Sequence, residues 1–373
     1  MRAPLVALLG LARVAAAPAA ARPSPIHVDG HRLADARGKT VRLVGVDRSG
    51  SEYACSGPVA GGGYGYGFWQ GPVDDASIQA MRTWRVRAVA LPLNEACWLG
   101  GYGGLNPAYT GKHYRRAIAG YVTRLEDHGI RVVLRLSGAA PGNLVYGKDP
   151  EISPSEIPMA DADHSLAFWR SVARRFKHDR TLTFHAFDEP NAIGWSCALH
   201  GCMATDRPEG HPRYGTYRAV GHQAIVDAIR STGARQPIVI SGIGFAGDVH
   251  RWGRYRPHDP LDQLVVGFNA FDFTGNYPGA KPDLARLAKR HPVLVGGFGD
   301  TDCNSDFSRA LMAFGDANGI SYLAWTWNTV QDYGGCSNAL LDGGDSSRPN
   351  RGYYTARPSG YGKGVRAHFR SIG

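Results

Sequence analysis

The sequence contains no apolar run long enough to cross a lipid bilayer, for which about 20 consecutive apolar residues are needed. It also lacks a linker rich in Pro, Ser or Thr, and no segment looks like an appended binding module. Its 373 residues are enough for one large domain with elaborate loops. We therefore expect a single domain and no association with a membrane.

Motifs for several common chemistries are also missing. The glycine-rich run at 61–67, G-G-G-Y-G-Y-G, does not match a dinucleotide fingerprint, and no Walker-type lysine follows a glycine-rich loop. No G-x-S-x-G supports a serine triad. The formal charge is +10, but there is no zinc-finger spacing and no basic-aromatic module. We interpret the excess arginines as a solvated outer face, and we do not expect a nucleic-acid partner.

Cysteine is scarce, with six residues. None of them forms a C-x-x-C pair, so a zinc site is not expected. Six cysteines allow fifteen disulfide pairings, and spacing alone does not choose among them. The cysteines are Cys55, Cys97, Cys197, Cys202, Cys303 and Cys336.

The first 21 residues have the pattern of a secretory signal peptide. Arg2 supplies the positive start, a short apolar run covers residues 3–12, and Ala19-Ala20-Ala21 offers an A-x-A cleavage site. We therefore expect export, with residues 22–373 forming the mature domain in an oxidising compartment where cysteines pair.

From residue 41 onward, apolar strands alternate with amphipathic helices, which is typical of a parallel sheet. Ahead of them, residues 26–43 predict a small β-hairpin that plugs the bottom of a barrel. The strands are predicted at 41–46, 86–91, 131–136, 181–187, 237–241, 264–271, 293–298 and 321–327. The helices are predicted at 74–83, 113–128, 161–176, 214–231, 282–289, 306–318 and 362–371. Eight strands in this order predict a (β/α)₈ barrel.

The segment T-L-T-F-H-A-F-D-E-P-N, residues 181–191, reads as a buried strand that stops at an acidic turn. Pro190 ends the strand because proline cannot donate to a sheet. Asp188 and Glu189 are thereby placed at the carboxyl end of a barrel strand, which is where barrel enzymes carry their chemistry.

Six segments in the same order resemble the glycoside hydrolase family 5 cellulases, particularly secreted actinobacterial ones. The resemblance covers nearly everything after residue 30, and it implies a monomer that acts on β-linked glycans such as cellulose without a metal or organic cofactor. It also suggests the disulfides Cys55–Cys97, Cys197–Cys202 and Cys303–Cys336. The six segments are V-R-L-V-G-V-D-R-S-G-S-E-Y-A-C (41–55), A-L-P-L-N-E-A-C-W-L (90–99), P-M-A-D-A-D-H-S (158–165), F-D-E-P-N (187–191), P-V-L-V-G-G-F-G-D-T-D-C (292–303) and Y-L-A-W-T-W-N-T (322–329).

The resemblance assigns two catalytic positions. Retaining glycosidases use an acid/base and a nucleophile, both carboxylates, on either side of the scissile bond. Glu189 matches the family's acid/base. The nucleophile is the second residue of Gly-Glu-Phe-Gly in the family, whereas this chain reads Gly-Gly-Phe-Gly at 296–299, so Gly297 occupies its position.

Supporting positions differ from the family as well. Ala90 aligns with an arginine that holds the nucleophile ionised, and Ser137 aligns with a histidine. Asp188 replaces an asparagine that contacts the sugar, and Asn269 and Phe271 replace a histidine and a tyrosine. An engineered glycosynthase would explain Gly297 but not Ala90 or Ser137.

Aromatic residues suited to sugar binding match the family better than the catalytic and supporting positions do. Trp325 and Trp327 fall on one face of the predicted last strand, and we prefer Trp327 as the floor under a sugar ring. Trp98 and Tyr277 are further candidates for substrate contact, with Trp69 and Trp195 on other loops.

Three hypotheses follow. The first is a cellulase-like protein with impaired catalysis that still binds a β-glycan. The second is a hydrolase in which Asp300 or Asp188, or else Asp47, works with Glu189. The third is a structural or interaction protein without a sugar site.

Overall fold

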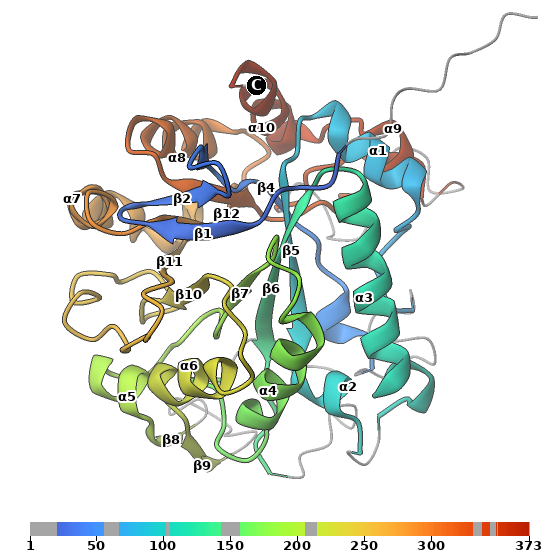
Figure 1. Cartoon of the computed structure of the whole chain (residues 1–373). Helices are drawn as coiled ribbons and strands as arrows, with labels where there is room; N and C mark the ends of the chain where they lie inside the picture. The colour runs from blue at the N-terminus through green and yellow to red at the C-terminus, as the bar shows by residue number, and fades with distance from the viewer. Residues whose placement is uncertain are drawn as a thin grey trace, which may run out of the picture.

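The centre of the molecule is a closed parallel barrel (Figure 1). The computed structural model describes residues 21–55, 67–101, 105–142, 157–205, 215–330, 338–343, 348 and 350–372. Around the barrel the strands follow the order β10-β11-β12-β13-β4-β5-β6-β7. They are β4 (Val44–Asp47), β5 (Ala88–Asn94), β6 (Arg131–Gly138), β7 (Thr183–His185), β10 (Ile238–Ser241), β11 (Leu264–Phe271), β12 (Val293–Gly299) and β13 (Ser321–Ala324).

Helices cover the outside of the barrel, as the alternating sequence pattern predicts (Figure 1). In α4, for example, Phe168, Trp169 and Val172 are buried while Arg174 and Arg175 occupy the last turn. The predicted (β/α)₈ fold is therefore confirmed. The helices are α1 (Asp75–Thr83), α2 (Glu95–Leu99), α3 (Lys112–Asp127), α4 (Ser165–Phe176), α5 (Trp195–His200), α6 (His222–Arg230), α7 (Tyr277–Ala288), α8 (Asp306–Ala317), α9 (Arg351–Thr355) and α10 (Gly360–Ser371).

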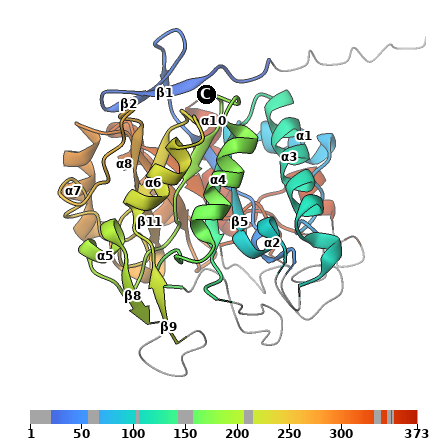
Figure 2. The ribbon, with the colours of Figure 1, turned by 60° about the horizontal axis from the view of Figure 1, so that its bottom comes forward.

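The predicted N-terminal hairpin is present and covers the amino end of the barrel (Figure 2). Strands β1 (Ile26–Asp29) and β2 (Arg32–Asp35) pair antiparallel, and the short β3 (Thr40–Val41) pairs with β2. Ile26 and Leu33 pack against inward side chains from the strand starts, including Ala90. The hairpin thus closes one end of the barrel, and function is left to the other end.

Three predicted helices are wrong at their start: the helix predicted at 161–176 begins at Ser165, the one predicted at 282–289 begins at Tyr277, and the one predicted at 214–231 departs most. Residues 214–231 were expected to be helical throughout, but Thr216–Ala219 form strand β9, which pairs antiparallel with β8 (Cys202–Thr205). The alternating burial of β9 fits a strand with one face covered. The helix α6 begins only at His222, after Gly221.

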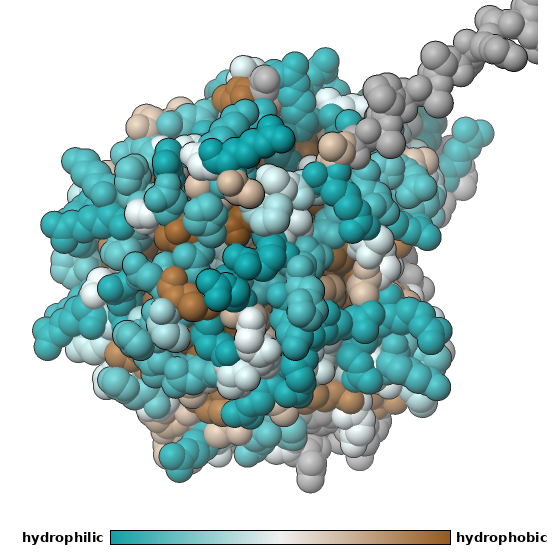
Figure 3. Space-filling view, in the orientation of Figure 1, coloured by the Kyte–Doolittle hydropathy of each residue, from teal (hydrophilic) through white to brown (hydrophobic). Residues whose placement is uncertain are grey.

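Two of the predicted disulfides, Cys55–Cys97 and Cys197–Cys202, are confirmed. Cys303 is disulfide-bonded as well, and Cys336, the partner predicted for it, lies outside the described residues. The face seen in Figure 3 is mainly hydrophilic, with hydrophobic residues scattered over it. No helix in the described part of the chain is both long and apolar enough to span a bilayer.

Candidate active site

A cavity of about 600 Å³ opens at the carboxyl ends of the barrel strands. It brings together five of the predicted site residues: Asp188, Glu189, Asn269, Gly297 and Trp325. The other described residues that line it are Glu52, Tyr53, Pro92, Arg135, Ser137, Gly244, Phe245, Phe271, Phe273, Thr274, Asn276 and Asn338. Because a 600 Å³ cavity falls within the usual range for small-molecule sites, it is the candidate active site.

The centre of the cavity is organised by Arg135, which the sequence analysis did not single out. Its side chain is buried, with Nη2 2.8 Å from an oxygen of Asp47 and Nε 3.1 Å from Oδ2 of Asp188. Nη1 donates to the carbonyl of Gly296 at 3.1 Å. Each guanidinium nitrogen therefore faces an oxygen from a different barrel strand or the turn that follows it.

Arg135 belongs to β6, whereas the family resemblance predicts an arginine at position 90, on β5. In the barrel register Ala90 pairs with Val133, and Pro92 pairs with Arg135. Ala90 contributes to the apolar layer under the hairpin. Arg135 comes from the neighbouring strand, one layer closer to the cavity. A charged residue at an inward position of β6, between Val133 and Ser137, was the signal in the sequence that could have revealed it.

Glu189 points into the cavity next to Asp188. Nδ2 of Asn269 donates to Oε1 of Glu189 at 2.9 Å and lies 3.3 Å from Oδ1 of Asp188. Burial raises the pKa of Glu189 to about 7, and the neighbouring charge of Asp188 adds to this effect. A carboxyl that keeps its proton near neutral pH can donate it to a leaving group, as a general acid requires.

Asp188 is held on several sides. Its Oδ2 accepts from Ser137 Oγ at 3.2 Å and faces Arg135. Its backbone carbonyl accepts from Ser241 Oγ at 2.7 Å, and that hydroxyl lies 2.7 Å from Nε2 of His185. These contacts fix the turn that carries Glu189, and Asp188 acts as a partner of Arg135.

Gly297 lies on β12 opposite Asn269 of β11. A Cβ built at Gly297 would make only ordinary contacts, 3.6 Å from Oδ1 of Asn269 and 3.6 Å from the Phe271 ring. Its φ is not in the left-handed region, so neither backbone geometry nor packing requires glycine there. The position thus has space for a side chain but presents no nucleophile to the cavity.

A second glutamate, Glu52, also lines the cavity. It lies in the 3-10 turn η1 (Ser51–Tyr53) after β4, and its carboxylate accepts from Ser49 Oγ at 2.5 Å and from the Gly50 amide at 2.7 Å. Burial raises the pKa of Glu52 to about 7. The family resemblance gave no role to this residue, although it lies within the first matching segment.

Three aromatic residues expected at the sugar site lie in the core instead. Trp327 packs edge-on against Trp84 at 4.8 Å, and Tyr277 packs against Phe307 and Phe314. Trp98 donates through its indole N–H to Ser171 at 3.0 Å, away from the cavity. All three are buried. We therefore leave them out of the proposed sugar contacts.

Of the two tryptophans expected on one face of the last strand, Trp325 lines the cavity formed by the described residues and Trp327 does not. Strand β13 ends at Ala324, so the two-residue alternation that placed both tryptophans on one face no longer applies beyond it. The Trp325 ring lines the cavity and lies 5.5 Å from the Arg135 guanidinium carbon.

Asp300, a candidate for a relocated carboxylate, does not line the cavity formed by the described residues. Its oxygens accept from the backbone amides of Phe307 and Ser308, each at 3.2 Å, and from the Ser308 hydroxyl. These bonds satisfy amides at the start of α8. Asp300 is thus committed to capping a helix.

Among the described residues, two groups have ligand atoms close enough to hold a metal ion, namely Glu95, Asp161 and His164, and Asp272, Asp300 and Asp302. The oxygens of Glu95 already accept from the Ala140 amide and the Ser165 hydroxyl, each at 2.6 Å. None of these residues lines the cavity. The groups with chemical potential that line the cavity are its carboxylates, Arg135 and its aromatic rings.

Comparison with known proteins agrees with this architecture. Residues 35–331 match the family described as "Cellulase (glycosyl hydrolase family 5)". The match covers most of the chain, which therefore belongs to glycosyl hydrolase family 5. A comparison with curated proteins found no match.

Solved structures share the fold at low sequence identity. The catalytic domain of the major endoglucanase from Xanthomonas campestris is 17% identical, with a TM-score of 0.62 over 93% of this chain and 99% of that one. The β-glucanase SdGluc5_26A from Saccharophagus degradans, in complex with cellotetraose, is 15% identical, with a TM-score of 0.61 over 94% of each chain. The catalytic domain of endoglucanase Cel5A from Thermobifida fusca is 14% identical, with a TM-score of 0.57 over 93% and 97%.

Proposed function

We propose that the protein is a cellulase-like member of its family that binds β-linked glucan in this cavity and has lost the two-step retaining reaction. The observation that carries the proposal is the pairing of Glu189, a carboxyl suited to proton donation, with Gly297, which cannot attack an anomeric carbon. Trp325 supplies an aromatic face for a sugar ring, and Asn269 supplies an amide. The neighbouring structure solved with cellotetraose supports a glucan as the ligand.

The two aspartates near Glu189 do not replace the nucleophile. Asp188 lines the cavity but faces Arg135, and Asp47 faces Arg135 without lining the cavity formed by the described residues. The loss of a catalytic unit in other enzymes lowers turnover by about a millionfold. The remaining proton donor and binding contacts are therefore expected to leave little hydrolysis.

Isothermal titration calorimetry with cellotetraose tests the binding half of this proposal. We expect the wild-type protein to bind and Trp325→Ala to weaken binding about tenfold or more, because an aromatic face is lost from the cavity. Trp195→Ala is the matched control, since Trp195 is partly exposed, stacks on Tyr255 and does not line the cavity. If the wild-type protein fails to bind any β-glucan, the proposal is wrong and a structural or interaction role takes its place.

A second candidate function is hydrolysis by a single displacement, and Glu52 favours it. Glu189 follows strand β7. Around the closed barrel, β4, which precedes Glu52, lies three strands from β7, and β12, which carries Gly297, lies three strands from β7 on the other side. Glu52 would accept a proton from water as that water attacks the anomeric carbon, while Glu189 would protonate the departing oxygen. Such an inverting reaction uses carboxyls about 6.5–9.5 Å apart.

The stereochemistry of the first product tests this second candidate. Proton NMR of a fresh digest would show the inverted anomer, and Glu52→Gln and Glu189→Gln would each abolish its release. A retained anomer, or undiminished release by Glu52→Gln, rules the candidate out.

We also propose that the protein is exported. The disulfides Cys55–Cys97 and Cys197–Cys202 support an oxidising compartment. Of the signal-like segment 1–21, residues 1–20 lie outside the described part of the chain, so the test is N-terminal sequencing of protein recovered from the culture medium. Cleavage after Ala21 is expected, and an intact N-terminus on cell-retained protein would contradict export.

A further inference from the structure

Two phenylalanines stand exposed at the edge of the cavity. Phe245 is 53% exposed and Phe273 is 67% exposed, and both line the cavity. The other large hydrophobic residues that are exposed in the described part of the chain, Met203 and Tyr354, lie elsewhere. Two exposed aromatic rings on the edge of a polar cavity form an apolar patch of the kind that marks a ligand-binding groove.

The loop that carries Phe245 is strained and tied to the site. Phe245 and Ala246 both have φ of 58°, a left-handed conformation that is uncommon for residues other than glycine. The Phe245 amide donates to the carbonyl of Pro190 at 2.9 Å, and the carbonyl of Ala246 accepts from the Asn269 amide at 3.2 Å. These backbone bonds connect the loop to Pro190, which follows Glu189, and to Asn269. They hold Phe245 at a fixed place beside Pro190 and Asn269.

Phe273 lies on the adjoining 3-10 turn η4 (Asp272–Thr274), and its ring stacks on Phe271 at 5.5 Å. The two loops are packed together through Asn276. Its Oδ1 accepts from Thr274 Oγ1 at 2.8 Å, and its amide lies so close to Gly247 that a Cβ there would collide with it. Phe245 and Phe273 therefore belong to one supported edge of the cavity.

We propose that Phe245 and Phe273 form an aromatic subsite that binds a second glucose ring of the glucan, next to the ring held at Glu189. This inference rests on the proposed function and extends it to ligand length and ring type. Phenylalanine offers an apolar face and no polar atom, so it suits a ring that presents only C–H groups on its face. A β-linked glucose unit does so, because all its hydroxyls are equatorial.

The contact with the two phenylalanine rings also determines which sugar configuration binds. Mannose carries an axial hydroxyl at C2, which interrupts one face of its ring and would meet an apolar phenyl group without a hydrogen-bond partner. Inside the cavity, by contrast, Oδ1 of Asn269 is buried and has no hydrogen-bond partner, so it is ready to accept from a ligand hydroxyl. The site therefore combines a polar centre with an apolar edge, and it favours a gluco-configured chain over a manno-configured one.

Calorimetric titration with cellotetraose and mannotetraose tests the subsite. We expect Phe245→Ala and Phe273→Ala each to weaken cellotetraose binding about tenfold, equivalent to about 1.4 kcal/mol. Their melting temperatures should stay close to that of the wild type, because the side chains removed are exposed. Phe273→Trp should keep the affinity, since it preserves an aromatic face. Met203→Ala, which removes a side chain that is 63% exposed on β8, is the matched control.

The outcomes separate this inference from the proposed function. If the wild type binds cellotetraose and both phenylalanine variants bind it equally well, the aromatic subsite is wrong while the proposed function stands. Equal affinity of the wild type for cellotetraose and mannotetraose would also overturn the ring preference. If the wild type binds neither sugar, the proposed function fails and the subsite fails with it.

Discussion

At the scale of single residues, Arg135 holds the centre of the site together. It is the only lysine or arginine among the described residues that line the cavity, and it faces Asp47 and Asp188. Burying one cation between two carboxylates is costly unless all partners are present, so the three groups form a unit. Trp325 adds a ring beside the guanidinium.

The first prediction concerns this unit. Replacing Arg135 with methionine should lower the free energy of unfolding by about 3–5 kcal/mol, because two buried carboxylates lose their counter-charge. Urea denaturation followed by circular dichroism measures the loss. Arg32→Met is the control, since the Arg32–Asp29 ion pair is exposed and should contribute at most about 1 kcal/mol. Adding Asp47→Asn to Arg135→Met should recover part of the loss, and equal losses in Arg135→Met and Arg32→Met would contradict the role of Arg135.

A second residue-scale prediction concerns pH. Burial raises the pKa of Glu189 from 4.5 to about 7 in the folded protein. The folded state therefore holds the proton more tightly than the unfolded chain, so this contribution to stability is complete below the unfolded pKa and disappears as pH rises through 7. The unfolding free energy of the wild type should fall more steeply between about pH 4.5 and 7 than that of Glu189→Gln. Parallel curves for the two proteins would contradict the raised pKa.

At this scale the sequence was informative only where a family motif existed. The strand-end position and the motif around Glu189 placed that residue in the cavity, and the same comparison exposed Gly297. Arg135 was missed because the expected arginine belongs to a different strand. Trp327 was expected on the same face as Trp325 because alternation was extended past Ala324, where the strand ends. Phe245 and Phe273 lie in loops, whose course depends on tertiary contacts.

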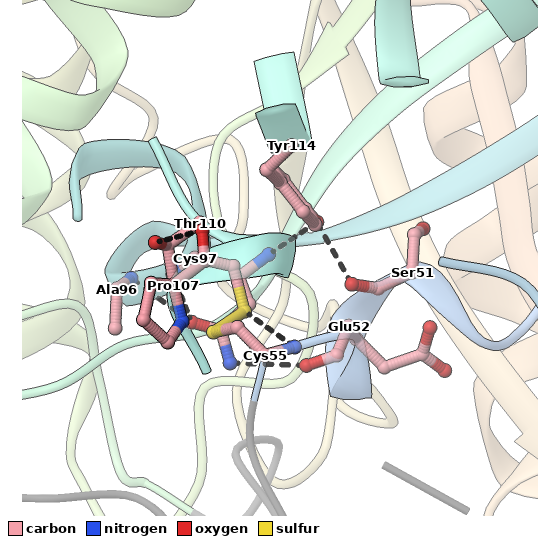
Figure 4. The surroundings of a disulfide bond; sticks show 9 residues. Ser51, Glu52, Cys55, Ala96, Cys97, Pro107, Thr110 and Tyr114 are labelled. Carbon is pink, nitrogen blue, oxygen red and sulfur yellow. Dashed lines mark hydrogen bonds between the residues drawn. A yellow bond between two sulfur atoms is a disulfide. The ribbon is translucent and has the colours of Figure 1, made fainter. Parts of the chain in front are cut away.

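At the scale of elements, a disulfide stabilises the turn that carries Glu52. Cys55 follows η1, and its bond to Cys97 joins this turn to α2 (Figure 4). The Tyr114 hydroxyl donates to the Ser51 carbonyl at 2.9 Å, and the Asn94 side chain donates to the Glu52 carbonyl at 3.0 Å. Figure 4 shows the Glu52 carboxylate pointing away from the disulfide. Backbone bonds and the disulfide thus fix the turn, while the carboxylate remains available to the cavity.

This arrangement gives a third prediction. Cys55→Ala/Cys97→Ala should cost about 4 kcal/mol of stability, because the disulfide closes a loop of 42 residues. Cys197→Ala/Cys202→Ala should cost about 2 kcal/mol, since its loop spans only 5 residues. Chemical denaturation under non-reducing conditions compares the two. A larger loss in the second variant than in the first would contradict the loop-length argument.

Most elements were predictable because burial imposes a clear sequence period on strands and helices. The barrel strands, the outer helices and the N-terminal hairpin all follow from such patterns. The β8–β9 hairpin was missed because β9 is short and leads directly into α6, so the two merged into one predicted helix. The glycine-rich run at 61–67 lies mainly outside the described residues.

At the scale of the whole molecule, fold and chemistry are separable. The barrel, its hairpin plug and its disulfides depend on residues distributed along the entire chain, whereas the retaining reaction depends on a few carboxylates at one end. A glycine at position 297 therefore leaves the fold and the cavity intact. The family match covers residues 35–331, but the activity has to be decided at the site.

Reducing-sugar release from carboxymethyl-cellulose, β-mannan and xyloglucan is the most direct test of the central claim. The wild-type protein and Glu189→Gln would be purified and assayed in parallel. Our account predicts that the wild type releases no more sugar than Glu189→Gln from any of the three polymers. Clear release by the wild type that Glu189→Gln abolishes would contradict it, and would show that a carboxylate other than one at position 297 completes the reaction.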